Sequence, residues 1–285
     1  MIVRPVSLAE QFSAFGMIDN DKRGLSTGFK NLDLRMRLIK GYMSIITGYP
    51  SSGKSEFLDM LLVNMSVQTS NWHHLVFSPE NKPIEGHMNK IAEKYIGKPS
   101  RDFTPTEMRQ ALVWLDEHFT WLNPAVPSLD AILRLAQEVA DNRFLDSVVI
   151  DPWNEVLHDK HGSMTHEYLS DALMKIRNFG KNNNTHMFIV AHPKIPVKDK
   201  NGCYGLPELY DISDGAMWRN KADYGWVAHR PDMSKNQMEV SVQKIKYKYM
   251  GKIMPPLLFD YDCPTGRFKE TTDQHYTIPT ALPFT

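Results

Sequence analysis

Short apolar runs alternate along the chain with longer stretches in which apolar residues recur every three or four positions. The runs have the length and β-branched content of buried strands, and the stretches have the period of amphipathic helices. Because strands that alternate with helices form parallel sheets, the pattern predicts an α/β fold. The expected strands are 42–47, 74–78, 147–151 and 186–191, and the expected helices are the stretch after residue 53, 83–96, the stretch capped by Ser128, and 165–181.

The pattern changes after residue 192, where a polar loop runs to Pro207. Successive strands are then expected at 224–228, 238–247 and 257–261, and we expect this C-terminal part to be antiparallel. The sequence therefore predicts a central, mainly parallel sheet flanked by helices, with antiparallel C-terminal strands. We divide the chain into an N-terminal arm or linker at 1–23, one domain at 24–270 and a tail at 271–285.

Composition narrows the class of protein. A hydrophobic fraction of 42% and a charged fraction of 23% are typical of a globular protein rather than a disordered or fibrous one. The 33 basic and 33 acidic residues give no net charge, so any contact with a polyanion must be local. Cys203 and Cys263 lie far apart, which favours a reducing compartment and not a zinc site. We find no membrane-span pattern or secretion leader and expect an intracellular protein.

Residues 48–55, GYPSSGKS, match the Walker A pattern between an expected strand and an expected helix. Gly48 and Gly53 let the backbone wrap around phosphates, while the helix N-terminus supplies N–H donors. Lys54 would reach the β- and γ-phosphates, and Ser55 would hold Mg²⁺. The alternative is a chance glycine turn, which the flanking strand and helix disfavour. The motif predicts a nucleotide site.

Acidic residues follow two of the expected strands. Asp151 ends the run SVVID, where a P-loop ATPase needs a carboxylate for its magnesium shell. Glu80 follows the strand after the P-loop helix, and Glu155 follows the Asp151 strand. Either glutamate could orient or deprotonate water, and either could be an exposed loop acid. Strand-end geometry favours Glu80.

Two further sets of residues have both a functional and a structural interpretation. His192 follows the apolar run MFIVA at another strand end, where it could sense a γ-phosphate or serve as a hydrogen-bonded structural histidine. Lys244, Lys246 and Lys248 alternate with apolar residues, so we expect them on one face of a strand. An anionic partner such as a phosphate would relieve their mutual repulsion, although a solvated strand face is the ordinary alternative.

Several segments resemble, in order, the helicase domain of Twinkle-type primase-helicases, which are relatives of the bacterial DnaB-type replicative helicases. IDPWNE, AHPK and LYDISDGAMWRNKAD are more specific than a Walker A motif, because nothing generic requires them together in a P-loop protein. The likeness covers most of the chain. The segments are STGFKNLD, GYPSSGKSEFLDML, FSPENKP, VVIDPWNE, VAHPK, LYDISDGAMWRNKADYGWVAHR and KIKYKYMGK.

The resemblance implies a RecA-like core, a homo-oligomeric ring, normally a hexamer, with ATP or another NTP and Mg²⁺ between subunits, and DNA in the central channel. It implies Asp151 and Ser55 at the metal, Glu80 as catalytic base and His192 as sensor. Lys244 matches the lysine of the family's K-x-R pattern, and Lys246 stands where relatives carry an arginine finger acting in trans; Lys248 could share that role. The implied nucleotide residues are Gly48, Ser51, Ser52, Gly53, Lys54, Ser55 and Glu56.

The expected partners follow from the resemblance. They are single-stranded DNA, a forked duplex, and primase and polymerase proteins, in the cytoplasm or nucleoid of a bacterial host cell, with no membrane partner. Lys194, Lys198 and Lys200 could contact the DNA backbone or simply aid solubility. The primase half of the family is missing, so the chain is either a free-standing helicase or an excised fragment. The alternatives are a RecA-like recombinase or loader that does not unwind DNA, and a non-catalytic nucleotide-binding module.

Overall fold

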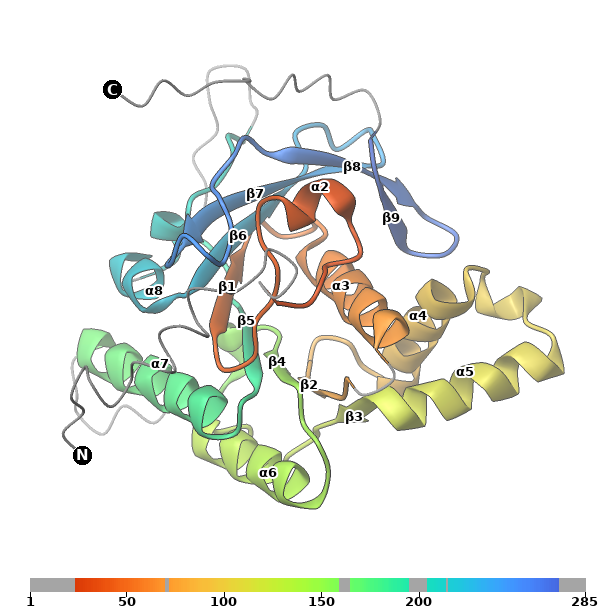
Figure 1. Ribbon diagram of the computed structural model, residues 1–285, viewed down its shortest axis with the longest axis horizontal. Coiled ribbons are helices and arrows are strands. Elements are labelled where there is room, and N and C mark those ends of the chain that lie inside the picture. Colours follow the sequence, from red (N-terminus) through yellow and green to blue (C-terminus); the bar gives the residue numbers. More distant parts are fainter. Residues whose placement is uncertain (1–23, 70–71, 159–164, 195–203, 214, 272–285) are drawn as a thin grey trace, which may run out of the picture.

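A computed structural model describes residues 24–69, 72–158, 165–194, 204–213 and 215–271. Within these residues, nine strands form one sheet in the order β3-β2-β4-β5-β1-β6-β7-β8-β9 (Figure 1). The strands are β1 (Met43–Thr47), β2 (His74–Phe77), β3 (Phe119–Trp121), β4 (Ser147–Ile150), β5 (His186–Val190), β6 (Tyr224–His229), β7 (Gln237–Ile245), β8 (Leu257–Asp262) and β9 (Arg267–Glu270). The expected arm at 1–23 and nearly all of the expected tail lie outside the described residues.

The sheet divides into a parallel and an antiparallel part. Neighbouring strands from β3 to β6 are parallel, whereas β7, β8 and β9 each run antiparallel to the strand before. The predicted fold class is therefore confirmed, with β6 joining the two parts. The strands β3 and β9 were not predicted from the sequence. β3 (FTW) has three residues and β9 (RFKE) has one apolar residue in four, so neither has the apolar run that marks the similarly short β2 and β4.

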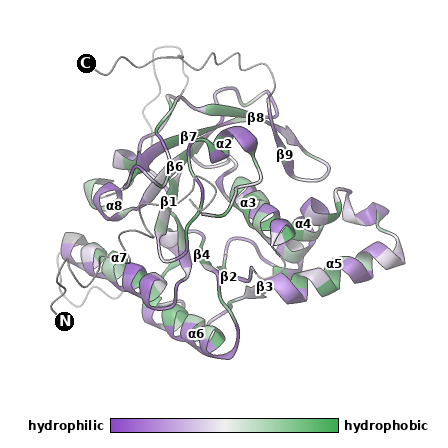
Figure 2. Cartoon of the chain, viewed as in Figure 1, coloured by the Kyte–Doolittle hydropathy of each residue, from purple (hydrophilic) through white to green (hydrophobic). Residues whose placement is uncertain are grey.

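Helices cover both faces of the parallel part (Figure 1). Successive side chains of a strand point to opposite faces, so Ile46 packs with the P-loop helix side of the core and Ile45 with the other side. Figure 2 shows the helices striped with hydrophobic and hydrophilic residues, as helices between a core and solvent should be. One face carries α3 (Lys54–Gln68), α4 (Ile84–Ile96) and α5 (Pro105–His118), and the other α6 (Leu129–Asn142), α7 (Thr165–Asn182) and α8 (Gly215–Lys221).

The beginning of α6 agrees with its sequence signal. The Ser128 hydroxyl accepts a hydrogen bond from the Ala131 amide, 3.2 Å away, so Ser128 is the predicted N-cap. A second helix start, at α5, has a full capping box between Thr104 and Glu107. Local side-chain chemistry therefore fixes where these two helices begin.

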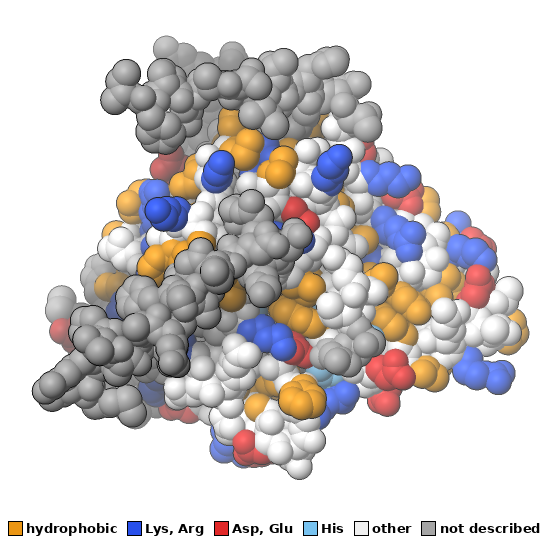
Figure 3. Space-filling model, in the orientation of Figure 1, with side chains coloured by type: hydrophobic (Ala, Val, Ile, Leu, Met, Phe, Trp, Pro, Cys, Tyr) orange, Lys and Arg blue, Asp and Glu red, His pale blue; other side chains and the backbone are white. Residues whose placement is uncertain are grey.

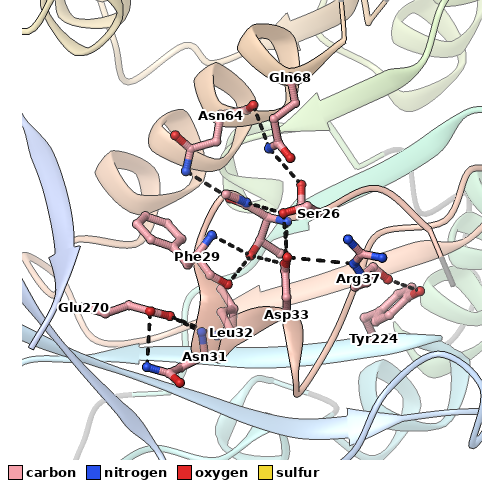
Figure 4. A network of polar contacts seen from close by, with 12 residues as sticks. Ser26, Phe29, Asn31, Leu32, Asp33, Arg37, Asn64, Gln68, Tyr224 and Glu270 are labelled. Atoms are coloured by element: carbon pink, nitrogen blue, oxygen red, sulfur yellow. Dashed lines mark hydrogen bonds and ion pairs between the residues drawn. The ribbon is translucent and has the colours of Figure 1, made fainter. Parts of the chain in front are cut away.

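The segment STGFKNLD is held in place by a network of polar contacts (Figure 4). Asp33 accepts hydrogen bonds from the Ser26 hydroxyl and from the amide and hydroxyl of Thr27, at 2.5 to 2.7 Å. Asn64 of α3 donates to the Thr27 carbonyl at 2.9 Å. Glu270 of β9 accepts from two amides at the start of α2 (Lys30–Asp33), where a negative charge is favourable. These contacts tie the first described residues to the P-loop helix and to the last strand.

The strand predicted at 238–247 ends early. β7 stops at Ile245, so Lys246 and Lys248 lie in the turn that follows, and the prediction of three lysines on one strand face is wrong. The pairing extends one residue past β7, where the Lys246 amide donates to the Asp223 carbonyl at 3.0 Å, and the chain then turns away from the sheet. In addition, the hydroxyls of Tyr249 and Tyr42 are hydrogen-bonded at 2.6 Å. Such tertiary contacts leave no trace in an alternating sequence.

Charged side chains do not gather by sign on the visible surface. In Figure 3, basic and acidic groups are interspersed wherever side chains are described on this face. The pattern agrees with the zero net charge of the sequence. The described part of this face therefore offers a nucleic acid local contacts and not a broad basic surface.

Candidate active site

The loop after β1 has the geometry of a phosphate-binding loop. Gly48 and Gly53 have φ angles of 153° and 90°, a region that favours glycine. A Cβ atom at Gly48 would lie 2.1 Å from the Ala228 carbonyl oxygen of β6, so no other residue fits. Gly53 leads directly into α3, whose free N–H groups face the loop. The predicted order of strand, glycine loop and helix is thus confirmed.

Lys54 and Asp151 form the charged centre of the site. Lys54 is buried, and its ammonium donates to the Tyr49 carbonyl at 3.0 Å. Burial lowers the pKa of Lys54 to about 8, although the nearby carboxylates of Asp151 and Glu80 oppose this effect. Burial likewise raises the pKa of Asp151 to about 6, against a hydrogen bond from the Ser55 hydroxyl that lowers it. Two buried groups of opposite charge therefore lie beside the first turn of α3.

Glu80 and His192 meet at the same edge of the sheet. The His192 Nε2 atom lies 3.8 Å from Glu80 Oε1, and the His192 amide donates to the Asn154 side chain at 3.2 Å. Burial and the charge of Lys54 lower the pKa of His192, while Glu80 raises it. The sequence argument that strand ends converge is correct here. A neutral imidazole beside a carboxylate can donate or accept a hydrogen bond at a phosphate or water.

A cavity of about 610 Å³ lies over the P-loop. Glu80 and His192 line it, whereas Glu155 is not among its lining residues within the described chain. Sequence reasoning missed the opposite wall, which comes from α4 and the antiparallel strands and their connections. Apart from Arg230, which ends the segment LYDISDGAMWRNKADYGWVAHR, no motif marks those residues, because the pairing of β7, β8 and β9 brings the strand residues to the P-loop. They are Lys90, Arg230, Asn236, Gln237, Met238, Tyr261 and Phe268.

The residues around this cavity fit a nucleotide and its magnesium ion. Ser52 Oγ and His192 Nδ1 are buried without a hydrogen-bond partner among the described residues, and a buried polar atom normally has one. The Ser55 hydroxyl and the Asp151 carboxylate, already in contact, are the oxygen ligands that Mg²⁺ prefers. These residues could donate to phosphate and supply oxygens to the ion, and their assignment to nucleotide and metal stays a prediction.

Glu56 lines the cavity, but its carboxylate is occupied by other groups. Lys94 and Lys90 lie 2.6 and 2.8 Å from its two oxygens. Although burial opposes ionisation, these two lysines lower the pKa of Glu56 below its ordinary value. The ion pairs join α3 to α4, so the structure gives Glu56 a contact that the motif did not suggest.

Lys244 and Lys246 lie at the opposite edge of the sheet, beside the start of β6. The Lys246 ammonium is 2.9 Å from Asp223 Oδ1. Lys244 donates to the carbonyls of Arg219 and Asn220 at the end of α8. We call the carboxyl ends of β1, β2, β4 and β5 the P-loop edge, and the region around Asp223 and these lysines the far edge.

The far edge is distant from the P-loop of the same chain. Asp223 precedes β6, whereas Ala228, five residues later on that strand, touches Gly48. Five strand residues span about 17 Å. Lys246 is anchored at Asp223, and a lysine side chain cannot cross that distance. Any role of Lys246 in phosphate chemistry would therefore require another copy of the chain.

The expected DNA-contacting lysines are only partly described. Lys194 is exposed just beyond β5, and its amide donates to the Asp211 carbonyl at 2.7 Å. Lys198 and Lys200 lie outside the described residues. Among the helices that the structure describes, none combines the length and the apolar character needed to cross a membrane.

Known proteins are similar to this chain in sequence and in fold. The chain is 34% identical over 266 residues to the Twinkle homolog protein, chloroplastic/mitochondrial, of Arabidopsis thaliana; the match covers 87% of this chain and 36% of the relative. No family model matches the chain. The chain thus spans little more than a third of the length of this relative.

The fold is similar to that of solved ATPase domains. One solved ATPase domain superposes with a TM-score of 0.72 at 17% identity, over 92% of this chain and 96% of the other. A DnaB-like replicative helicase, studied with primase, gives 0.70 at 18%, over 94% and 67%. The RadB recombinase gives 0.58 at 14%, over 85% and 97%.

The fold is the RecA-like fold of these solved domains. Within that class, the sequence and the two more similar structures match a Twinkle/DnaB-like helicase domain. The resemblance noted from the sequence motifs is confirmed.

Proposed function

We propose that the chain is the ATP-hydrolysing motor domain of a replicative DNA helicase, which translocates on single-stranded DNA and unwinds duplex. One observation supports this proposal most. Lys54, Glu80 and His192 come from three separate segments and line one cavity at the P-loop edge, and Asp151, from a fourth segment, lies beside Lys54 and Ser55. The 34% identity with a Twinkle homolog supports the assignment of this site to a helicase.

In the proposed reaction, ATP binds with its phosphates against the loop from Gly48 to Ser55. The loop amides and Lys54 would hold the phosphates, and Ser55 and Asp151 would hold a magnesium ion, which would supply positive charge to offset that of the phosphates. Glu80 accepts a proton from water as the water oxygen bonds to the γ-phosphorus and the bond to the ADP oxygen breaks. His192 hydrogen-bonds the γ-phosphate and changes partner when phosphate leaves.

We assign the other half of the site to a neighbouring copy. Lys246 of one subunit would approach the γ-phosphate bound by the next, with Lys244 and Lys248 beside it. This assignment accounts for the distance between Lys246 and the P-loop of its own chain. A head-to-tail contact of that kind gives a ring when its rotation closes, and the resemblance to ring helicases leads us to propose a homo-oligomer, normally a hexamer, as the active form.

DNA would be contacted by Lys194, which lies two residues after His192 at the carboxyl side of β5, and by Lys198 and Lys200, which lie outside the described residues. Backbone contacts by lysine carry no sequence preference. Release of phosphate near His192 could then move the segment that holds the DNA. Primase and polymerase are the proposed protein partners of the assembled helicase.

The test of the ATPase proposal compares two glutamates at strand ends. We expect Glu80→Gln to lower the DNA-stimulated ATPase rate by about 100-fold or more, because water activation is lost. Glu155→Gln is the matched control and should stay within about threefold of wild type. Equal rates for Glu80→Gln and wild type would exclude Glu80 from the mechanism.

A RecA-like recombinase or loader is the second candidate, because the RadB recombinase shares the fold with a TM-score of 0.58. Both classes would hydrolyse ATP on DNA. Unwinding of a forked duplex separates them, since only a helicase yields the single strands. ATPase activity without unwinding by the assembled ring would favour the second candidate.

A further inference from the structure

Asp223 is a buried carboxylate that contacts two cations. Its side chain is 1% exposed. Oδ1 accepts from Arg177 at 2.5 Å and from Lys246 at 2.9 Å, and Oδ2 accepts from the Met43 amide at 3.1 Å. A single cation is enough to neutralise a buried carboxylate. One of the two cations can therefore leave without exposing an uncompensated charge.

The two cations are not equivalent. The Arg177 side chain, from α7, is 18% exposed, and its Nε atom is buried without a hydrogen-bond partner in the described chain. The Lys246 side chain is 29% exposed and lies outermost, with its ammonium 5.2 Å from the centre of the exposed Tyr247 ring. Lys246 is the cation that can turn outward.

Only the side chain of Lys246 is free to move. Its amide is hydrogen-bonded to the Asp223 carbonyl at 3.0 Å. The following turn is anchored by Tyr249 on Tyr42 and by a bridge between Gly251 and Met36. A rotation of the flexible lysine stem would carry the ammonium away from Asp223 while the main chain stays in place.

We propose that Asp223 and Arg177 are positioning residues for Lys246. Asp223 holds the lysine at the far edge in the lone chain. Arg177 then keeps Asp223 neutralised when Lys246 turns to the phosphate bound by a neighbouring copy. This inference rests on the proposed trans role of Lys246. It adds that Asp223 and Arg177 together determine how easily the Lys246 ammonium leaves Asp223. A lysine can be released in this way because its ammonium gives up one ion pair, to Asp223, and a contact with the exposed Tyr247 ring.

The first test measures the contact itself and needs no assembly. Pulse acetylation of the whole chain without nucleotide, read by mass spectrometry, compares Lys246 with the exposed Lys248. We expect Lys246 to react about tenfold more slowly. Asp223→Asn should bring the two rates together, and Arg177→Met should leave Lys246 at least as protected as in wild type. Equal rates in wild type, or faster reaction of Lys246 in Arg177→Met, would overturn the inference.

The second test measures release during turnover. Arg177→Met should lower kcat of the DNA-stimulated ATPase by about tenfold with little change in KM, because Lys246 must then stay on Asp223. Arg177→Lys restores the charge and should stay within about threefold of wild type. The double variant Arg177→Met with Asp223→Asn removes both charges and should regain most of the rate.

The outcomes separate this inference from the proposed function. Wild-type kcat in Arg177→Met contradicts the neutralising role. A rate for Arg177→Lys as low as for Arg177→Met would also contradict it, and would indicate that the guanidinium itself acts on phosphate. Melting curves of the single and double variants identify loss of folding, which the double variant would not reverse. Lys246→Ala with a wild-type rate would instead refute the trans role, while the acetylation result would stand.

Discussion

The P-loop edge and the far edge of the sheet differ in how their charges are balanced within one chain. At the P-loop edge, Ser52 and His192 keep buried polar atoms without partners among the described residues, and a cavity lies open above them. At the far edge, Lys246 is already paired with the buried Asp223. A lone chain therefore has unpaired polar atoms that a ligand could contact at the P-loop edge, and a cation that is paired within the chain at the far edge. Each edge supplies what the other lacks.

The largest effect is expected when the two edges are inactivated in separate chains, which tests whether they form one active site between subunits. Lys54→Ala removes the phosphate contact, and Lys246→Ala removes the proposed trans contact; each alone should lower DNA-stimulated ATPase by about 100-fold or more. Mixing the two inactive proteins should restore activity. In randomly mixed rings about a quarter of the interfaces combine an intact P-loop with an intact Lys246.

The control for this experiment is a mixture of Lys54→Ala with the double variant Lys54→Ala and Lys246→Ala. No interface in that mixture has an intact P-loop, so its rate should stay at background. If the first mixture also stays at background although rings form by size-exclusion chromatography with light scattering, the two edges do not share one site.

The P-loop itself should also be sensitive to added volume. Gly48→Ala places a methyl group 2.1 Å from the Ala228 carbonyl in a left-handed backbone. We expect a loss of about 3 kcal/mol in the free energy of unfolding, from the clash and the strained φ together. Gly205→Ala is the matched control, because nothing lies within 4 Å of its added atom. Equal urea midpoints for the two variants would contradict the packing described here.

The far edge should be the more sensitive to acid. His186 is fully buried between two strands and the preceding loop: its Nδ1–H donates to the Ile39 carbonyl at 2.7 Å, and its Nε2 accepts from the Ser44 hydroxyl at 2.8 Å. Burial lowers the pKa of His186 from 6.5 to about 4. The unfolded chain therefore binds the proton more tightly, so the stabilisation is complete above pH 6.5 and is lost as the pH falls toward 4.

Urea unfolding between pH 7.5 and pH 5 measures this effect. From the two pKa values, His186 alone should cost roughly 2 kcal/mol of unfolding free energy by pH 5. Burial also lowers the pKa of His74 well below its ordinary value, so the total loss should be larger. The variant His186→Gln should be less stable at pH 7.5 and should show a shallower dependence on pH. An unchanged slope would exclude His186 as a source of the acid sensitivity.

Sequence alone located the P-loop edge much better than the far edge. Gly48, Lys54 and Ser55 follow one another, and Asp151 and Glu80 each follow an apolar strand, so local patterns were enough. The far edge depends on Asp223 and Arg177, which are 46 residues apart. The turn after Ile245 depends on Tyr42, far away in sequence. The alternating lysines predicted a β7 strand longer than the one observed. Alternation of polar and apolar residues reflects which face each side chain occupies, and it carries no information on tertiary contacts such as that of Tyr249 with Tyr42.

The finest test of the comparison changes the far edge by one functional group. Lys246→Arg would give the neighbouring phosphate a planar fork with two parallel N–H donors, a geometry that lysine lacks. The same fork would also bind Asp223 more firmly in the lone chain. We expect the arginine to stabilise the transition state more than it stabilises the pair with Asp223, because Asp223 already accepts from Arg177. The value of kcat should therefore rise by about two- to fivefold, with little change in KM. Acetylation of Lys248 should be the same in both proteins and serves as the control for an intact turn. A fall in kcat would mean that release from Asp223, and not the contact with phosphate, limits the contribution of this residue.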